Sequence, residues 1–498
     1  INGFNTNDVL RGGRGNDTLS GGPGDDTYYY AQGDGNDVII ENAAGNFSTV
    51  DTLNLLDINP AGVSLVRNGN DLTVVIAETA PGAGNGGSIL LKSELDDFFS
   101  TGVERIVFAD GTIWTQADLR VKTLAQASTR GNDTITGFNT NDILTGGPGN
   151  DTLSGVAGDD TYIYARGDGN DTIIEGTAGN FTTFDTLRLQ NIDPASVSFV
   201  RNLNDLTLVV AETAPGAGNG GSILLKDELD DWFSQGVERV AFDNGTVWSQ
   251  ADLRAMLLTQ AINAGSGDIL GFNVADTLVA GLGDRFLNGR GGADTYVYSS
   301  AGGNDVIADP GNFVSRLQFS DIVSTDVSLS RRVANNGADL VIINNLTGKT
   351  VTVQREFSGG AMLSVQFSDG VSWSQAQILD ILAANGGGYM FGRGDGQVTF
   401  AQSVTSLRMA AGISASDVIL QSSGTDLIVK LRGSTDSITV QGALTINAWG
   451  VSSSLAQLKF SDGTTLDLGK PDAGHGLPLT FTWLGTGNNY FLTGSNYG

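Results

Sequence analysis

Residues Gly12 to Asp26 read GGRGNDTLSGGPGDD, and the pattern of this stretch returns after nine residues. Each copy has two glycines, a spacer, a third glycine, a second spacer and an aspartate. Glycine tolerates backbone angles that side chains forbid, so the chain can turn sharply there and expose its carbonyl oxygens. The rest of each copy, as in DTLSG, offers one apolar side chain that can point inward from a short strand. Turns and strands in this alternation predict a coil.

The aspartates of this pattern predict a bound calcium ion. Ca²⁺ takes six to eight oxygen ligands, which carboxylates and backbone carbonyls supply. Only nine of the 55 acidic residues are glutamate. A merely solvated acidic surface would use glutamate as freely, whereas aspartate suits turns and metal loops. A flexible acidic linker is the alternative, but a linker need not keep its phase or its inward Leu, Ile and Tyr.

The nonapeptide resembles the calcium-binding motif GGxGxDxUx of the repeats-in-toxin (RTX) or haemolysin-type family. The matching blocks are GFNTNDVLR, GGRGNDTLS and GGPGDDTYY, then GNDTIT, GFNTNDILT, GGPGNDTLS and GVAGDDTYI. The resemblance implies an all-β fold, a parallel β-roll or β-solenoid with two nonapeptides per turn. Each Ca²⁺ then lies between stacked loops eighteen residues apart. On this chain the implied pairs are Asp8 with Asp26, Asp133 with Asp151, and Asp142 with Asp160.

The resemblance also implies which residues bind or frame the metal. Asp17 has no partner eighteen residues upstream. Asp37 and Asp171 follow the preceding motif aspartate by eleven residues, so a ligand and a turn-forming role both stay open for them. The candidate calcium-site residues are Asp8, Asp17, Asp26, Gly12, Gly13, Gly15, Gly22, Gly24, Asp133, Asp142, Asp151, Asp160, Gly146, Gly147, Gly149, Gly158, Asp276 and Asp294.

The chain is a tandem array of decaying units. At an offset of 134 residues, 89 of residues 1–120 match residues 135–254 without a gap. A third unit keeps Asp276 and Asp294 eighteen residues apart, but it has Arg285 where the pattern requires aspartate, and a fourth has Gln397 in GRGDGQVT. We expect no calcium at Arg285 or Gln397. The predicted units are 1–128, 129–262, 263–385, 386–470 and a final linker with a further RTX-like segment, 471–498.

Between the nonapeptides the sequence predicts β-rich modules with few helices. Segments such as VSLVR and DLTVVIA alternate apolar and polar residues, as half-buried strands do. A helix is expected over Ser93 to Gly102 (SELDDFFSTG), and others after Trp114, Trp248 and Trp373. The three tryptophans are expected to close the core of each unit, although an exposed ring could also stack on a sugar.

Composition limits the classes of function. The formal charge of −28 and the pI near 4.1 argue against nucleic acid or an anionic membrane as a partner. Cysteine is absent, so a metal must be bound through oxygen. No run approaches the roughly 20 apolar residues of a membrane span. Millimolar extracellular calcium is expected to fold the glycine and aspartate runs, which should be disordered without cations because their carboxylates repel.

A catalytic role is not expected. The single histidine, His475, lies in DAGHGLP with no GxSxG motif nearby, so neither a triad nor a zinc site of the HExxH type is supported. Paired carboxylates such as Asp96 with Asp97 and Asp230 with Asp231 could serve glycoside chemistry. They recur in near-identical units, however, which favours a solvated face or support of a calcium site.

Three functions remain open. The leading hypothesis is a secreted calcium-binding structural protein that self-associates into a surface layer, filament or matrix. The second is an adhesin that binds polysaccharide or another cell, and the third is the calcium-binding tail of a larger enzyme or toxin. The RTX resemblance implies one-step secretion from a Gram-negative bacterium. Ile1 starts in the phase of Ile135 and Gly498 could stand where Gly131 stands, which hints at a longer tandem polymer.

Overall fold

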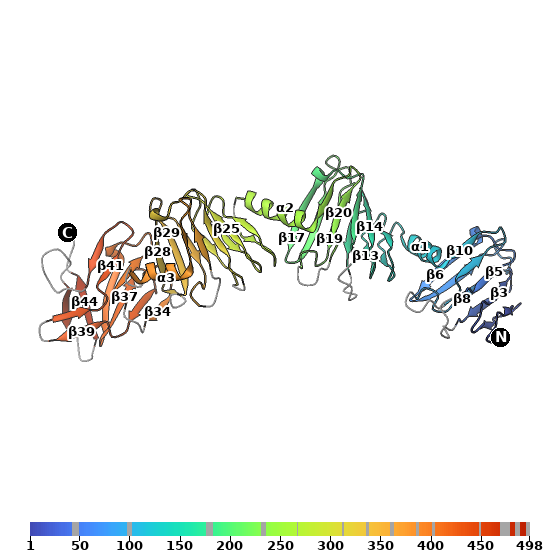
Figure 1. The fold of residues 1–498 in the computed structure, drawn as a ribbon, viewed down its shortest axis with the longest axis horizontal. Helices are drawn as coiled ribbons and strands as arrows, with labels where there is room; N and C mark the ends of the chain where they lie inside the picture. Colours follow the sequence, from blue (N-terminus) through green and yellow to red (C-terminus); the bar gives the residue numbers. More distant parts are fainter. Residues whose placement is uncertain are drawn as a thin grey trace. The chain divides into compact units, whose positions relative to one another are not determined.

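The computed structural model describes residues 1–41, 49–96, 102–175, 183–230, 236–265, 267–310, 313–334, 338–358, 363–384, 388–400, 404–447, 450–468, 479–483 and 489–494. The chain divides into two compact halves, Ile1–Arg254 and Ala255–Gly498. In both halves short strands are stacked side by side, and the helices among the described residues are few (Figure 1). The predicted all-β class with a parallel β-roll is therefore confirmed.

The first unit consists of two sheets that successive nonapeptides enter in alternation. The pairs formed by the nonapeptide strands are parallel, whereas the later hairpins are antiparallel. One sheet has, in order, β1 (Val9–Leu10), β3 (Thr27–Tyr30), β5 (Thr52–Leu55), β9 (Arg105–Val107) and β10 (Ile113–Thr115). The other has β2 (Thr18–Leu19), β4 (Asn36–Ile39), β8 (Gly87–Leu91), β7 (Asp71–Ile76) and β6 (Val63–Asn68).

The core of this unit is a stack of one inward side chain from each strand. Leu10 lies opposite Tyr28, Tyr28 opposite Leu53, and Leu53 opposite Ile106, and all four are buried. Neighbouring side chains of a strand point to opposite faces, so one apolar residue per nonapeptide is enough to build the stack. The β-rich segment continues this sheet, because β5 and β9 extend the parallel ladder that β1 and β3 begin.

The second unit repeats this architecture within the N-terminal half. The strands of one sheet are β11 (Thr134–Thr136), β13 (Thr152–Ser154), β15 (Asn170–Ile173), β19 (Gly221–Leu225), β18 (Asp205–Val210) and β17 (Val197–Asn202). Those of the other are β12 (Ile143–Thr145), β14 (Thr161–Ala165), β16 (Thr186–Gln190), β20 (Arg239–Phe242) and β21 (Val247–Ser249).

The third and fourth units share a ten-stranded sheet in the C-terminal half. Its order is β22 (Ile269–Leu270), β24 (Phe286–Asn288), β26 (Asp305–Ile307), β30 (Thr350–Val353), β29 (Asp339–Asn344), β28 (Val327–Arg332), β33 (Tyr389–Phe391), β35 (Ser406–Met409), β41 (Gln457–Lys459) and β42 (Thr465–Asp467). The third unit is completed by β23 (Thr277–Val279), β25 (Thr295–Tyr298), β27 (Arg316–Phe319), β31 (Ser364–Gln366) and β32 (Ser372–Trp373).

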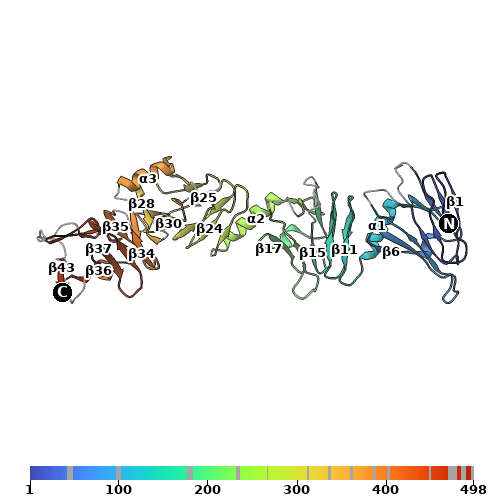
Figure 2. The same cartoon turned by 90° about the horizontal axis from the view of Figure 1, so that it is seen from below.

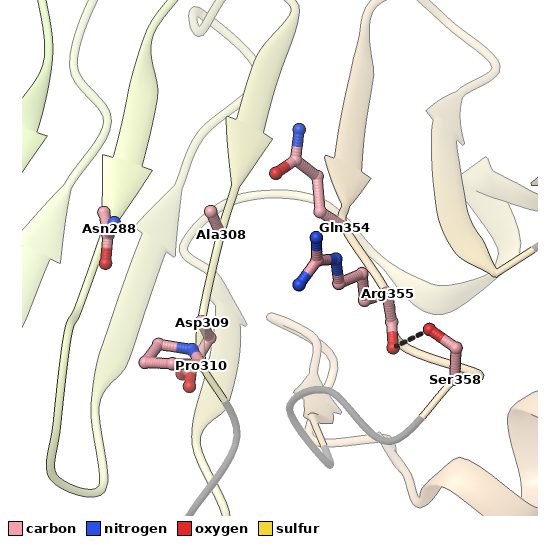
Figure 3. A pocket seen from close by; sticks show the side chains of 7 residues that line it. All are labelled: Asn288, Ala308, Asp309, Pro310, Gln354, Arg355 and Ser358. Carbon is pink, nitrogen blue, oxygen red and sulfur yellow. Dashed lines mark hydrogen bonds between the residues drawn. The ribbon is translucent and has the colours of Figure 1, made fainter. Parts of the chain in front are cut away.

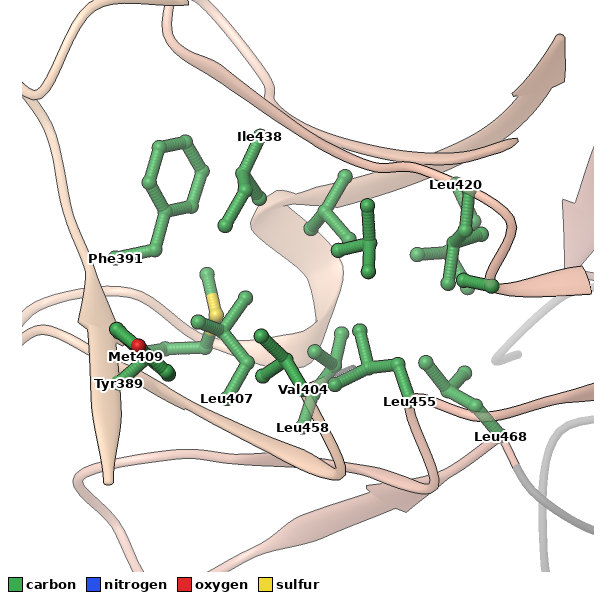
Figure 4. Packing of buried hydrophobic residues seen from close by; sticks show 14 of the residues in the cluster. Tyr389, Phe391, Val404, Leu407, Met409, Leu420, Ile438, Leu455, Leu458 and Leu468 are labelled. Carbon is green, nitrogen blue, oxygen red and sulfur yellow. The ribbon is translucent and has the colours of Figure 1, made fainter. Parts of the chain in front are cut away.

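The fourth unit continues the solenoid although its nonapeptides are lost. Strand β28 pairs in parallel with β33 through Arg331 and Tyr389. Phe391, Leu407 and Ile438 pack between the shared sheet and a second one (Figure 4). Figure 2 labels strands of both sheets, among them β28 and β35 of the shared one. That second sheet has β34 (Gln397–Phe400), β38 (Ser437–Val440), β37 (Asp426–Leu431), β36 (Val418–Ser423), β44 (Asn489–Gly494) and β43 (Leu479–Trp483), and β39 (Leu444–Asn447) pairs with β40 (Gly450–Ser453).

A helix follows each of the three tryptophans, as the sequence predicts. These helices are α1 (Gln116–Ala127), α2 (Gln250–Asn263) and α3 (Gln375–Ala384). The tryptophans pack edge-on against phenylalanine rings, with centroids 4.5 Å apart for Phe108 and Trp114. None of the helices that the structure describes has the length and apolar character to cross a membrane.

The helix predicted over Ser93 to Gly102 is wrong in the part that the structure describes. Residues 92–95 form a turn, and residues 97–101 lie outside the described residues. The backbone of Ser93 is left-handed, with φ of 56°, which ends any helical continuation. The side chain of Glu94 is buried here and accepts the N–H of Val103 at 2.8 Å. A buried carboxylate that binds this backbone therefore replaces the expected amphipathic helix.

Candidate calcium-binding site

The motif aspartates form a ladder along the roll. In the first unit the N–H of Asp8 donates to Asp26 Oδ1 at 2.7 Å, and the N–H of Asp17 donates to Asp37 Oδ1 at 2.9 Å. Each carboxylate thus binds the backbone of a motif residue one coil earlier. The predicted pair of Asp8 with Asp26 is brought together. Asp17 has its partner downstream, in Asp37.

The ladder recurs in the second and third units. Asp171 occupies a ladder position, as Asp37 does, although both follow the preceding motif aspartate by eleven residues. The N–H to Oδ1 distances are 2.7 Å for Asp133 to Asp151, 2.8 Å for Asp142 to Asp160, 3.0 Å for Asp151 to Asp171 and 2.9 Å for Asp276 to Asp294. All four predicted eighteen-residue pairs are therefore in contact.

The second oxygen of many ladder carboxylates is buried without a hydrogen-bond partner. These atoms are the Oδ2 atoms of Asp17, Asp26, Asp151, Asp160, Asp294 and Asp305. A buried carboxylate oxygen costs free energy unless a donor or a cation satisfies it. In every one of these groups except Asp17, Oδ1 already accepts a backbone N–H, so Oδ2 is available to a metal. This donor set fits a hard divalent cation such as Ca²⁺, which carboxylates and loop carbonyls would hold.

The first glycine of each nonapeptide makes room for this carboxylate. A Cβ at Gly12 would lie 2.7 Å from Asp17 Oδ2, and one at Gly137 would lie 2.6 Å from Asp142 Oδ2. At Gly146 a Cβ would collide with the Asp151 carboxylate. At these glycines any side chain larger than hydrogen would push the carboxylate away.

The later glycines of the motif shape the loops and let them stack. Gly24 has φ of 144°, and a Cβ on it would lie 2.6 Å from the carbonyl of Thr6 in the neighbouring loop. Gly158 makes the same close approach to Thr140. The remaining predicted loop glycines with left-handed backbone are Gly13, Gly15, Gly22 and Gly147. At Gly149 glycine is required for a different reason, because a Cβ there would collide with the carbonyl oxygen of Gly131.

Burial makes the unliganded ladder electrostatically unfavourable. Loss of hydration, together with neighbouring carboxylates, raises the pKa of Asp160 and that of Asp171 to about 7. In the third unit burial raises the pKa of Asp294 to about 7, and Asp309 and Asp276 add to the effect. A carboxylate in such a place is neutralised by a proton or by a cation. A calcium ion would supply the positive charge that the described ladder lacks.

The guanidinium of Arg285 places a positive charge in the third unit, where the motif would have an aspartate. The backbone N–H of Arg285 donates to Asp305 Oδ1 at 2.8 Å, as a ladder residue does. Its buried guanidinium donates to the carbonyl of Ala261 at 3.2 Å and to that of Ile262 at 3.0 Å, at the end of α2. Asp276 and Asp294 belong to the other sheet edge, so the arginine does not interrupt their pair.

Replacing Arg285 by aspartate is expected to make the third unit depend on calcium. In chelator, Arg285→Asp should lower the free energy of unfolding by about 3 kcal/mol, because charged hydrogen bonds are lost and a buried charge is added. Saturating calcium should restore most of this loss. Urea denaturation with and without calcium measures both effects. Arg316→Gln, an exposed position on β27, serves as the control, and equal losses with and without calcium would contradict the interpretation.

The fourth unit uses internal hydrogen bonds where the motif is lost. Asp395 pairs with Arg332 at 2.7 Å and accepts the N–H of Gly392 at 2.7 Å. Asp436 accepts the N–H groups of Gly394 and Gly396, at 3.0 and 2.8 Å. The loop before Gln397 is therefore held by the protein's own donors.

Sequence reasoning missed part of the site. The first glycines Gly21 and Gly155 lie against the carboxylates of Asp26 and Asp160, and the phase of the nonapeptide alone could have identified them. It also missed acidic residues beyond the nonapeptides, of which Glu41 is one. Three residues weighed as catalytic, His475, Asp97 and Asp231, lie outside the described residues.

Comparison with known proteins agrees with this geometry. The model of the RTX calcium-binding nonapeptide repeat matches residues 2–39, 128–162 and 136–173. The model of the haemolysin-type calcium binding protein related domain matches residues 71–118 and 426–469. No curated protein matches the chain.

Among solved structures, the extracellular lipase LipA from Serratia marcescens is similar over 45% of this chain, at 18% sequence identity and a TM-score of 0.17. The chain spans 36% of the lipase chain. The nonapeptide matches coincide with the aspartate ladders of the first two units. The first and second units therefore contain RTX calcium-binding nonapeptide repeats, and segments of the first and fourth units match the haemolysin-type calcium binding protein related domain.

Proposed function

We propose that the protein is a secreted structural component whose calcium-loaded units form a stiff element of an extracellular surface layer, filament or matrix. The observation that carries the proposal is the continuity of the fold inside each unit. The parallel ladder runs from β1 through β3 and β5 to β9 without a break in register. Nonapeptides and β-rich segments thus form one solenoid, as is typical of repeat proteins that serve as spacers.

Calcium supplies the folding free energy in this proposal. An ion that binds only the folded coil stabilises it by about 2.7 kcal/mol per independent site at a hundredfold excess over its Kd. In a compartment poor in calcium the coils would be only marginally stable, so the chain could be unfolded for export. Millimolar calcium outside the cell would then stabilise the folded coils. Secretion in this manner is common among RTX proteins and is proposed for this chain as well.

The chemistry of the chain supports a non-catalytic role. The sequence has one histidine and no cysteine, so the common nucleophilic and metal-hydrolase arrangements have few residues to draw on. Its conspicuous carboxylates recur in tandem copies, in positions where they bind backbone N–H groups. Such repetition suits a role that grows with the number of units.

Sedimentation and negative-stain microscopy test the proposal. We expect calcium to convert the chain from a slowly sedimenting monomer into ordered fibres or sheets, and excess chelator to reverse the change. Magnesium at the same concentration is the control, since it demands stricter octahedral geometry. Compact monomers at high protein concentration under calcium would contradict an array. In that case the adhesin and the enzyme-tail hypotheses gain support, and glycan binding becomes the next measurement.

A further inference from the structure

A cluster of buried carboxylates lies where the nonapeptide coil of the first unit meets the strands that follow it. Asp26, Glu41 and Asp51 each place one carboxylate oxygen within 4.8 Å of the others. Asp26 belongs to the last nonapeptide, whereas Glu41 follows β4 and Asp51 precedes β5. Two of the three residues thus lie outside the RTX motif and outside the sites that the motif implies.

The ladder of hydrogen bonds leads into this cluster and beyond it. The N–H of Asp26 donates to Asp51 Oδ1 at 2.7 Å, and the N–H of Asp51 donates to Glu104 Oε2 at 2.6 Å. The partners are 25 and 53 residues apart in sequence, unlike the eighteen of the motif. The fold therefore gathers four acidic side chains at this junction.

One oxygen of the cluster is deeply buried and has no partner. Asp26 is 0% exposed, its Oδ1 binds the N–H of Asp8, and its Oδ2 has no hydrogen-bond partner. The hydroxyl of Tyr28 donates to Glu41 Oε1. Arg105 Nε donates to Thr52 Oγ1 at 2.8 Å. Asp26 Oδ2 is therefore a buried carboxylate oxygen that is available to bind a cation.

The second unit repeats the cluster with Asp160, Glu175 and Asp185. The N–H of Asp160 donates to Asp185 Oδ1 at 2.7 Å, and Glu238 accepts the N–H of Asp185. Asp160 is 1% exposed, and both its Oδ2 and Glu175 Oε1 are buried without a partner. The two independent copies therefore leave the same aspartate oxygen free.

We propose that these junctions are two further divalent-cation sites, formed by Asp26, Glu41 and Asp51 and by Asp160, Glu175 and Asp185. Carboxylate oxygen is the only donor type in each triad, which favours Ca²⁺ over softer metals. Glu104 and Glu238 position the triads through the backbone of Asp51 and Asp185. The cation links the nonapeptide coil to the later strands, so each unit would fold as one body.

The electrostatics of the triads agree with a cation. Burial raises the pKa of Glu41 and that of Glu175 to about 8, and the carboxylates of Asp51 and Asp185 add to the effect. Burial also raises the pKa of Asp51 to about 7. The three carboxylates of each triad lie close enough together for one bound cation to relieve their mutual repulsion.

The third unit offers a natural comparison, because the triad is dismantled there. Asp294 and Asp309 remain, but Ser315 stands in the place of Asp51, and its Oγ accepts the N–H of Asp294 at 3.1 Å. By strand register Leu363 replaces Glu104. Asp309 and Arg355 line the same pocket of about 320 Å³ (Figure 3).

Counting bound ions in the full-length chain tests the proposal. The double variant Asp51→Asn/Asp185→Asn removes two charges but keeps an oxygen that can accept the N–H of Asp26 and Asp160. We expect it to bind two fewer calcium ions per chain than the wild type in equilibrium dialysis. The matched control is Glu78→Gln/Glu212→Gln, an exposed pair in equivalent loops, which should bind the wild-type number.

A second variant keeps the test decisive if the first one folds poorly. Glu41→Gln/Glu175→Gln retains Tyr28 as a hydrogen-bond donor and should also lose two ions, while circular dichroism under calcium stays that of the wild type. Terbium luminescence excited through tyrosine should fall in both variants. An unchanged ion count in a folded variant would overturn the proposal and show that protons neutralise the triads. The count does not depend on assembly, so it is independent of the proposed structural role.

Discussion

Without calcium, the protein is expected to be markedly more stable at pH 5 than at pH 8. The reason is the set of buried carboxyls whose pKa lies well above that of an unfolded chain. Burial raises the pKa of Asp160 and Asp171 to about 7, and that of Glu41 and Glu175 to about 8. Unfolded aspartate and glutamate titrate near pH 4.

The sign of the effect follows from proton linkage. A group with a raised pKa in the folded state binds its proton more tightly there than in the unfolded chain. Its stabilising contribution is fully present below about pH 4 and is lost as the pH rises through about 7 to 8. After allowance for solvent screening, each group contributes on the order of 1–2 kcal/mol. Coupling between neighbours makes the sum smaller than the number of groups suggests.

Calcium is expected to reverse this dependence, because it competes with protons for the same oxygens. Urea denaturation between pH 5 and pH 8 measures the effect, once after passage over a chelating resin and once in saturating calcium. Asp160→Asn should flatten the calcium-free profile, whereas Asp110→Asn, at an exposed turn, should leave it unchanged. A calcium-free protein whose stability rises with pH would show that the carboxyls are ionised and satisfied in another way.

The sequence was sufficient to predict the coil because its information is local. Two nonapeptides make one turn, so Asp8 must lie beside Asp26, and one apolar residue per copy, such as Leu10, must face inward. The glycines could be placed for the same reason. Gly21 follows from the phase of the motif in the same way, and a Cβ there would collide with the Asp26 carboxylate.

The junction could not be predicted, because no fixed spacing describes it. Asp51 reaches Asp26 across 25 residues, and Glu104 reaches Asp51 across 53, after the insertion of the β6–β7 hairpin. The failed helix at Ser93 has a similar origin. The apolar periodicity of this segment is a local signal. The backbone of Ser93 is held by a residue of an earlier strand, because Asp71 Oδ1 accepts the N–H of Ser93 at 2.9 Å.

Substitution of Gly155 by alanine is expected to disable the calcium site of its loop while leaving the backbone conformation permissible. A Cβ at this position would collide with Asp160 Oδ2 and would lie 2.5 Å from Asp160 Cγ and 2.8 Å from the Tyr162 hydroxyl. Gly155 has no left-handed φ, so backbone strain does not contribute. The buried carboxylate must move, and we expect a loss of about 2–4 kcal/mol in stability under calcium.

Gly131 provides the matched control for this variant, since it is also a nonapeptide glycine of the second unit without a left-handed φ. A Cβ there would meet only Thr129 Oγ1, at an ordinary 3.6 Å. Gly131→Ala should therefore change stability by less than about 1 kcal/mol, and calcium affinity hardly at all. Gly155→Ala should weaken binding at least about tenfold in calorimetric titration, because ligand geometry and not chain flexibility is altered. Equal effects of the two substitutions would mean that the glycines serve chain flexibility alone, and that the close packing of Gly155 against Asp160 does not shape the metal site.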